Sequence, residues 1–240
     1  MLYLVSLFAL LVLYAEAVWF LPRLKNHRLW NALFAASIFI LYAVHTFLIY
    51  LDVGAKDWNF TNTLPVANVS PFMFAFMLFI HLFPKRVKKY LYALVVLLSV
   101  GMILAALLGC ASRFFIQYRF HATFLLDYIG HALLSLWGVY MIRSEQIKMS
   151  RRETAIGGSL IVGVAFLMLI LNLIFDTSFF GLSLKGKHNI YNNVLTDSSV
   201  LSAVLYFTGL VAVLAMGYGF AFLLTKLNEK QSKNEIHKQI

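Results

Sequence analysis

The chain has 240 residues, of which 61% are hydrophobic and only 12% are charged, and its formal net charge is +10. This composition excludes a water-soluble globular protein, because repeated apolar runs of about 20 residues match the thickness of a bilayer. The single cysteine, Cys110, excludes an internal disulfide and a site built from several cysteines. No nucleic-acid partner is predicted, because the basic residues lie in short loops without an aromatic recognition module.

Seven apolar runs predict seven membrane-spanning helices, because lipid offers exposed backbone groups no hydrogen-bond partner. We therefore predict an all-α, multi-pass bundle in the cell membrane. One seven-helix transmembrane domain is expected over residues 1–225, followed by a charged and frayed cytoplasmic tail over 226–240. The predicted spans are, in chain order, Leu2–Leu21, Leu29–Leu51, Leu64–Phe83, Tyr90–Cys110, His121–Ile142, Thr154–Phe175 and Val200–Thr225.

Small residues within the spans indicate where the helices touch. Helices in a bilayer approach most closely where their side chains are small, because lipid supplies no hydrophobic drive between them. We interpret these residues as packing positions rather than functional ones. The contacts are expected at Ala105 and Ala106, at Gly157 and Gly158, and at Gly209, Gly217 and Gly219.

The basic residues predict the orientation of the bundle. Fifteen of the twenty Lys and Arg residues fall in alternate connecting segments. Cytoplasmic loops carry an excess of these residues, so the distribution predicts an N-terminus outside the cell and a C-terminus in the cytoplasm. Anionic lipids on the cytoplasmic side suit this charge, and membrane lipids are the expected partners. The segments predicted to lie inside are 22–28, 84–89, 143–153 and 226–240.

Ionisable side chains inside a membrane are costly, so each one predicts a functional position. Asp127 and His131 are four residues apart in the fifth span and share one helix face. A carboxylate beside an imidazole fixes the tautomer and raises the basicity of the ring, which suits a general-base pair. The structural alternative is that the two buried groups satisfy each other and hold helices in register.

Further polar residues are predicted at a similar depth below the outer surface. The rise of a helix puts Asp127 roughly 9 Å deep, and it puts His45 of the second span at about the same depth. Asn68 and Ser70 of the third span would lie roughly 6–9 Å deep. Pro71 predicts a kink beside them, and broken helices near mid-depth are typical of residues that line a cavity.

The same residues provide a poor metal site. His45, Asp127 and His131 offer at most three ligands, and these come from two helices without a recognisable motif. We therefore predict no metal and no cofactor.

Four short motifs lie in or beside the predicted spans. Leu64-Pro65 opens the third span, Phe120-His121 precedes the fifth, and a Gly-His-Ala-Leu-Leu run follows at Gly130–Leu134. An Asp-Thr-Ser-Phe-Phe segment begins at Asp176, before the last span. With these motifs the chain resembles the YwaF-like family of bacterial integral membrane proteins, and the resemblance covers most of the chain.

The resemblance implies a chemistry for this site. Eukaryotic relatives of the YwaF-like family include a membrane acyltransferase that remodels ether phospholipids with a cysteine and a histidine. By resemblance, His131 is that histidine, and the cysteine would end a Leu-Pro-Leu-His-Leu-Cys run. This chain reads Leu-Pro-Val-Ala-Asn-Val from Leu64 to Val69, so the expected cysteine is absent. The adjacent Ser70 is a candidate nucleophile in its place, with His131 as base and Asp127 orienting the ring.

The sequence leaves three functions open. An enzyme that acts on lipid acyl chains from the outer leaflet, as an acyltransferase or hydrolase, would use Ser70, His131 and Asp127 as catalytic residues and His45 and Asn68 to bind substrate. A small-solute transporter or binding protein would use the same groups, and would have polar residues near both surfaces. The third alternative is a non-enzymatic partner subunit in a membrane complex or homo-oligomer. Because the predicted polar groups cluster toward one side, we favour the lipid role.

Overall fold

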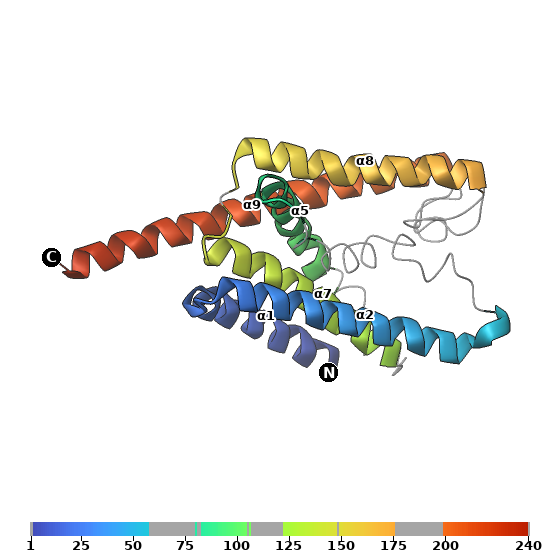
Figure 1. The fold of residues 1–240 in the computed structure, drawn as a ribbon, viewed down its shortest axis with the longest axis horizontal. Helices are drawn as coiled ribbons and strands as arrows, with labels where there is room; N and C mark the ends of the chain where they lie inside the picture. The colour runs from blue at the N-terminus through green and yellow to red at the C-terminus, as the bar shows by residue number, and fades with distance from the viewer. Residues whose placement is uncertain are drawn as a thin grey trace.

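The computed structural model describes residues 2–57, 80, 83–104, 106, 122–147, 149–175 and 199–239. Every secondary-structure element in these ranges is a helix, so the all-α prediction is confirmed for this part of the chain (Figure 1). The elements are, in chain order, α1 (Leu2–Phe20), the 3-10 helix η1 (Leu21–Arg23), α2 (His27–Asp57), α5 (Lys85–Leu104), α7 (Ala122–Arg143), α8 (Arg151–Phe175) and α9 (Ser199–Gln239).

The six α-helices overlap six of the seven predicted spans. Five of them, all except α1, contain stretches long and apolar enough to cross a membrane, as judged over the described ranges. The predicted third span, Leu64–Phe83, lies outside the described residues except for Ile80 and Phe83. The seventh helix and the orientation of the two termini therefore stay predictions.

The last helix is longer than its apolar run. α9 continues to Gln239, so the helix extends beyond Thr225, where the sequence ended it, and the fraying of the tail stays a prediction. Lys, Glu and Gln dominate this segment, and all three favour helix when isolated in water. The predicted end of the helix was too early because it was placed where the apolar residues end, although charged residues of high helix propensity continue the helix.

α5 forms the centre of the bundle. It packs against α7, α8 and α9, and Figure 1 shows it nearly end-on while α2, α8 and α9 run across the view. α5 is therefore buried on most sides, whereas large apolar side chains of α8 and α9, such as Phe166 and Leu223, are exposed. That pattern suits a bundle whose outer face meets lipid. The buried residues of α5 are Leu91, Ala93, Leu94, Val95, Val96, Leu97, Leu98, Ser99 and Met102.

Two of the predicted glycine contacts are confirmed. A Cβ atom added to Gly217 of α9 would lie 2.0 Å from the carbonyl oxygen of Leu97, and one added to Gly157 of α8 would lie 3.2 Å from the backbone nitrogen of Leu94. Both neighbours belong to α5, so the central helix is approached closely from two sides. The prediction for Gly219 was wrong, because an added Cβ there would meet open space.

The four basic segments gather at one end of the bundle. Lys89 at the start of α5 forms an ion pair with Glu153 at the start of α8, at 3.4 Å. The side chain of Arg143, at the end of α7, donates a hydrogen bond to Asn228 of α9, and η1 packs against α7. A single basic side is what the predicted membrane topology requires. We call this end of the bundle the basic end.

Candidate functional site

His131 and Asp127 form a compact pair on α7. The imidazole of His131 is 4% exposed, and the Asp127 side chain is partly open at 30%. Nδ1 of His131 lies 2.7 Å from the backbone oxygen of Asp127 and 3.3 Å from its carboxylate oxygen Oδ1. The predicted i, i+4 contact is therefore present, and one residue supplies both oxygens.

This geometry determines the tautomer of a neutral His131 ring. A backbone carbonyl can only accept a hydrogen bond, so Nδ1 must carry the proton that it donates to Asp127. The lone pair of the neutral ring then lies at Nε2. A free lone pair at Nε2 is what a general base requires, and the nearby carboxylate would stabilise the positive charge that the ring gains when it accepts a proton.

His45 joins this pair from a second helix. α2 packs against α7, and the half-buried His45 interacts electrostatically with both Asp127 and His131. His45 therefore lies within electrostatic range of the pair, and its role in one common site stays a prediction. Ser70 and Asn68, the other two predicted site residues, lie outside the described residues, so their roles stay predictions. Within the part of the chain that the structure describes, no three His, Cys, Asp or Glu residues are grouped as metal ligands.

A tyrosine of the first helix supports the same turn of α7. Tyr14 is buried, and its hydroxyl donates a hydrogen bond of 3.4 Å to the backbone oxygen of Ala132. Its apolar neighbours include Leu10 and Tyr128. Because Ala132 directly follows His131, this contact fixes α1 against the segment that carries the His131 and Asp127 pair, which we call the dyad. No local pattern in the sequence predicts this contact, since 118 residues separate the partners.

A second polar cluster surrounds Arg143 at the other end of α7. Its guanidinium side chain is 2% exposed, and three different groups accept its hydrogen bonds. Nε donates to the backbone oxygen of Val18 at 2.8 Å, Nη1 to Oδ1 of Asn228, and Nη2 to Oε1 of Gln231 at 2.7 Å. All three acceptors are neutral. Arg143 therefore ties α1, α7 and α9 together without a carboxylate contact in the described ranges.

The turn after Arg143 has the hydrogen bonds of a Schellman motif. The backbone nitrogen of Gln146 donates to the oxygen of Met141, and that of Glu145 donates to Ile142. Glu145 adopts a φ of 56°, in the left-handed region of backbone conformation that is usually occupied by glycine. This turn reverses the chain and directs Gln146 back toward the bundle.

Gln146 completes a row of three hydrogen-bonded side chains between α2 and the turn after α7. Trp137 Nε1 donates to Oδ1 of Asn31 at 2.8 Å, and Nδ2 of Asn31 donates to Oε1 of Gln146 at 2.5 Å. The buried polar groups of α2 and α7 thereby satisfy each other, which avoids the cost of leaving them unpaired. These three hydrogen-bonded side chains lie between α2 and the end of α7, near the basic end.

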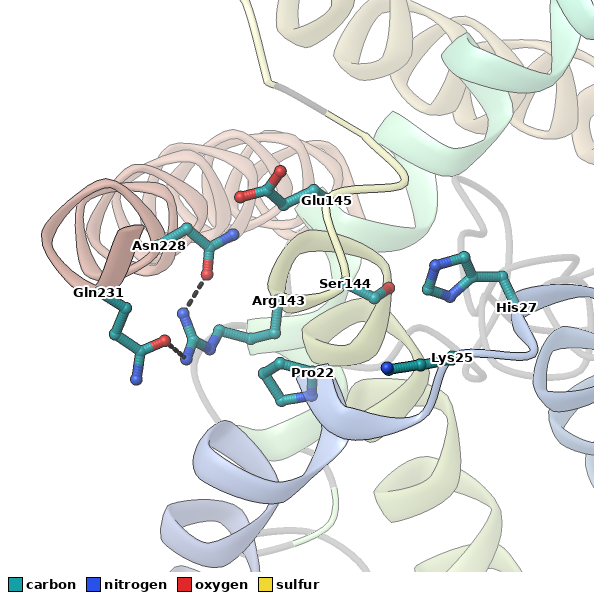
Figure 2. Close-up of a pocket in the computed structure, with 8 residues that line it drawn as sticks. All are labelled: Pro22, Lys25, His27, Arg143, Ser144, Glu145, Asn228 and Gln231. Carbon is teal, nitrogen blue, oxygen red and sulfur yellow. Dashed lines mark hydrogen bonds between the residues drawn. The ribbon is translucent and has the colours of Figure 1, made fainter. Parts of the chain in front are cut away.

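A polar pocket of about 380 Å³ opens beside Arg143 (Figure 2). Figure 2 shows Lys25 extending toward Ser144 and Arg143, whereas the carboxylate of Glu145 points away from Lys25 and His27. Nδ1 of His27 lies 3.0 Å from the hydroxyl of Tyr140, which itself donates to the backbone oxygen of Leu24. The lining residues are Pro22, Lys25, His27, Arg143, Ser144, Glu145, Asn228 and Gln231.

A third feature is an apolar groove of about 1010 Å³ between α8 and α9. Phe166 and Val162 of α8 face Val204 and Phe207 of α9 across it. Its apolar lining is compatible with lipid acyl chains. Of the predicted site residues that the structure describes, His45, Asp127 and His131, none lines this groove.

Comparison with protein families decides where the chain belongs. The model of the TMEM164 family matches residues 1–225. The chain is a member of the TMEM164 family. Together with its apolar helices, membership makes it a multi-pass integral membrane protein. Neither a curated protein nor a solved structure matches it.

In this TMEM164-family chain, the match ends where the predicted tail begins, so Asn228 and Gln231 lie beyond it. The partners of Arg143 therefore come from both parts of the chain. Sequence reasoning assigned Arg143 to membrane topology alone and missed its contacts. The available signal was that Arg143 directly continues an apolar helix, where a charged side chain needs hydrogen-bond partners.

Proposed function

We propose that this TMEM164-family protein is a membrane enzyme that acts on phospholipid acyl chains from the outer leaflet. His131 is the general base, Asp127 orients and stabilises its ring, and Ser70 is the nucleophile. The observation that carries the proposal is the buried His131 ring, whose Nδ1 is held by Asp127 so that Nε2 bears the lone pair. The resemblance to YwaF-like proteins, with their acyltransferase relatives, supports the choice of substrate.

The proposed reaction is an acyl transfer through a covalent acyl-serine. Ser70 Oγ attacks the carbonyl carbon of an acyl ester while Nε2 of His131 accepts the serine proton. The ester bond to the lipid alcohol breaks, and that alcohol leaves with the proton from His131. A second lipid alcohol, or water, then gives its proton to His131 and attacks the acyl carbonyl carbon. The bond between the acyl group and Ser70 Oγ breaks, and His131 returns the proton to Ser70. The first acceptor makes the protein an acyltransferase and the second makes it a hydrolase.

His45 and Asn68 are the proposed substrate-binding residues. Support for His45 is its place on α2, which packs against α7, and its electrostatic interaction with Asp127 and His131. A donor from either residue would stabilise the negative charge that develops on the acyl carbonyl oxygen. In this role they would affect the rate more than the binding of the lipid tails.

A transport function is the second candidate. A transporter needs polar groups near both membrane surfaces, and the cluster around Arg143 adds such groups at the end of α7 opposite to Asp127. The buried residues between the two clusters include Leu134 and Trp137, which are fully enclosed. Transport would therefore require this middle section of α7 to open.

The test is an acyl-transfer assay on the full chain in liposomes, with a labelled phospholipid as donor and a lysophospholipid as acceptor. His131→Asn is expected to lower the rate by roughly 10²–10⁴-fold, the usual contribution of a general base. Glu229→Gln, at an exposed ion pair of α9, is the matched control and should keep the rate of the original chain.

A second pair of variants tests the nucleophile. Ser70→Ala should abolish transfer, and Ser70→Cys should restore part of it, because a thiol can form the same acyl intermediate. If Ser70→Ala and His131→Asn both transfer acyl groups at the original rate, the enzyme proposal is wrong. Uptake of a labelled solute that depends on His131, without acyl transfer, would favour the transporter.

A further inference from the structure

The pocket at the basic end is lined by a buried arginine, an exposed lysine and a half-buried histidine. Arg143 lies at its base, while Lys25 is exposed and His27 is half-buried at its rim. They come from three places in the chain: the end of α7, the link after η1 and the first residue of α2. The fold therefore places three basic residues along one cavity, and Figure 2 shows the Arg143 guanidinium directed at Asn228 and Gln231, on the side away from Lys25 and His27.

The charge of Arg143 is incompletely balanced by its contacts. Its acceptors are an amide of Asn228, an amide of Gln231 and a backbone carbonyl, and no carboxylate of the described ranges forms an ion pair with it. Glu145 attracts it electrostatically without such a contact. Buried charges are normally paired with opposite charge, because removing an ion from water is expensive. An anion in the adjoining pocket would supply the missing charge.

Several donors around the pocket are available to such an anion. A guanidinium has five N–H groups, and the bonds of Arg143 described above use three. Within the described chain, Lys25 Nζ has no hydrogen-bond partner. Nδ1 of His27 donates to the Tyr140 hydroxyl, because that hydroxyl gives its own proton to Leu24, so Nε2 of His27 is a donor only when the ring is protonated. The hydroxyl of Ser144 is already used, because it donates to Tyr140 and accepts from Gln146. The free donors therefore belong to the basic side chains.

We propose that this pocket binds a phosphate group, held by Lys25 and by His27 in its protonated form, next to the buried positive charge of Arg143. Phosphate suits the donor set, because its tetrahedral oxygens accept several charge-assisted hydrogen bonds at once. A cavity of about 380 Å³ holds a phosphate together with the small group that carries it. The carrier is either the headgroup of an anionic phospholipid at the basic side of the membrane or a free phosphate compound in water.

The experiment compares three probes on the full chain, stripped of lipid in a neutral detergent. Short-chain phosphatidylglycerol carries the phosphate on a lipid, diacylglycerol has the same chains without phosphate, and inorganic phosphate has no chains. Binding of each is measured by native mass spectrometry and by the shift in thermal unfolding. Neither readout needs turnover, so a chain that binds phosphate but transfers no acyl group would refute the proposed enzyme and keep this site.

The variants are Lys25→Gln and His27→Gln, with Arg86→Gln as the control. Arg86 is an exposed basic residue near the start of α5, at the basic end but outside the pocket. Lys25→Gln should weaken phosphatidylglycerol binding roughly tenfold, the effect of losing one hydrogen bond to a charged group. Arg86→Gln should leave binding unchanged. Lys25 and Arg86 are exposed and His27 is half-buried, so none of these substitutions removes the buried Arg143, whose loss would disturb folding.

Two outcomes support the site and identify its source. Phosphatidylglycerol binding that inorganic phosphate does not displace assigns a lipid headgroup, whereas phosphate that binds alone and displaces the lipid assigns a soluble compound. Two others overturn the proposal. Equal binding of diacylglycerol and phosphatidylglycerol would mean that phosphate is not recognised. Equal weakening by Lys25→Gln and Arg86→Gln would mean diffuse attraction by surface charge.

Discussion

Gly217 of α9 lies directly against Leu97 of α5, so closely that a Cβ atom at position 217 would be 2.0 Å from the Leu97 carbonyl oxygen. The obstacle is backbone, which cannot rotate aside as a side chain can. Gly217→Ala is therefore expected to force the two helices apart and to lower the free energy of unfolding by about 1–3 kcal/mol. Thermal unfolding in detergent measures the effect.

Gly219→Ala is the matched control for this prediction. The two glycines are on the same helix, but an added Cβ at 219 meets no atom within 4 Å. Both substitutions gain the same intrinsic helix propensity, which favours Ala over Gly. Gly219→Ala should therefore be neutral or stabilising, and equal melting temperatures for the two variants would contradict the close approach of α5 and α9.

Asp127→Asn is expected to impair activity less than His131→Asn. The backbone oxygen of Asp127 still accepts the proton of Nδ1 in the variant, so the tautomer of His131 is retained. The carboxylate 3.3 Å away is lost, and with it the stabilisation of a protonated ring. We expect a loss of roughly tenfold in the acyl-transfer rate, below the 10²–10⁴-fold typical of removing the base itself. A loss from Asp127→Asn as large as that from His131→Asn would assign the orienting role to the carboxylate alone.

Arg143→Ala should destabilise the bundle by about 3 kcal/mol, because it leaves a backbone carbonyl and two side-chain amides without their donor. A double-mutant cycle with Asn228→Ala isolates the contact between α7 and α9. We expect a coupling energy of about 0.5–3 kcal/mol, measured from unfolding in detergent. Strictly additive effects of the two substitutions would show that the contact contributes nothing to stability.

Glu145→Gly should stabilise the turn after α7. A left-handed conformation costs an ordinary residue about 1–2 kcal/mol, and glycine adopts it freely. Part of that gain is offset because glycine makes the unfolded chain more flexible, so a net increase below about 1 kcal/mol is expected. Glu145→Ala keeps the backbone cost and removes only the charge. If both variants unfold at the same temperature, the effect comes from charge and not from the turn.

The sequence predicted those features of the fold that depend on local composition. Apolar runs located the helices, because a long apolar segment has few alternatives to a membrane helix. The pairing of Asp127 with His131 was equally accessible, since residues four apart on a helix meet regardless of the rest of the fold. The helical end of α9 was missed only because hydropathy was weighed above helix propensity.

The cluster around Arg143 could not be predicted in this way. Its bonds join positions 85, 88 and 125 residues apart, and such pairings depend on how whole helices pack. No spacing rule connects Val18, Arg143 and Gln231. The sequence therefore identified the dyad within one helix but not the site that three helices assemble.

Covalent labelling of Ser70 tests the central claim most directly. A fluorophosphonate with a long alkyl chain should react with Ser70 in liposomes, losing fluoride while the serine proton passes to His131. The account predicts one labelled peptide containing Ser70, no label in Ser70→Ala, and labelling slowed roughly 10²–10⁴-fold in His131→Asn. An unlabelled Ser70, or labelling that proceeds at the same rate without His131, would contradict the proposed catalytic site.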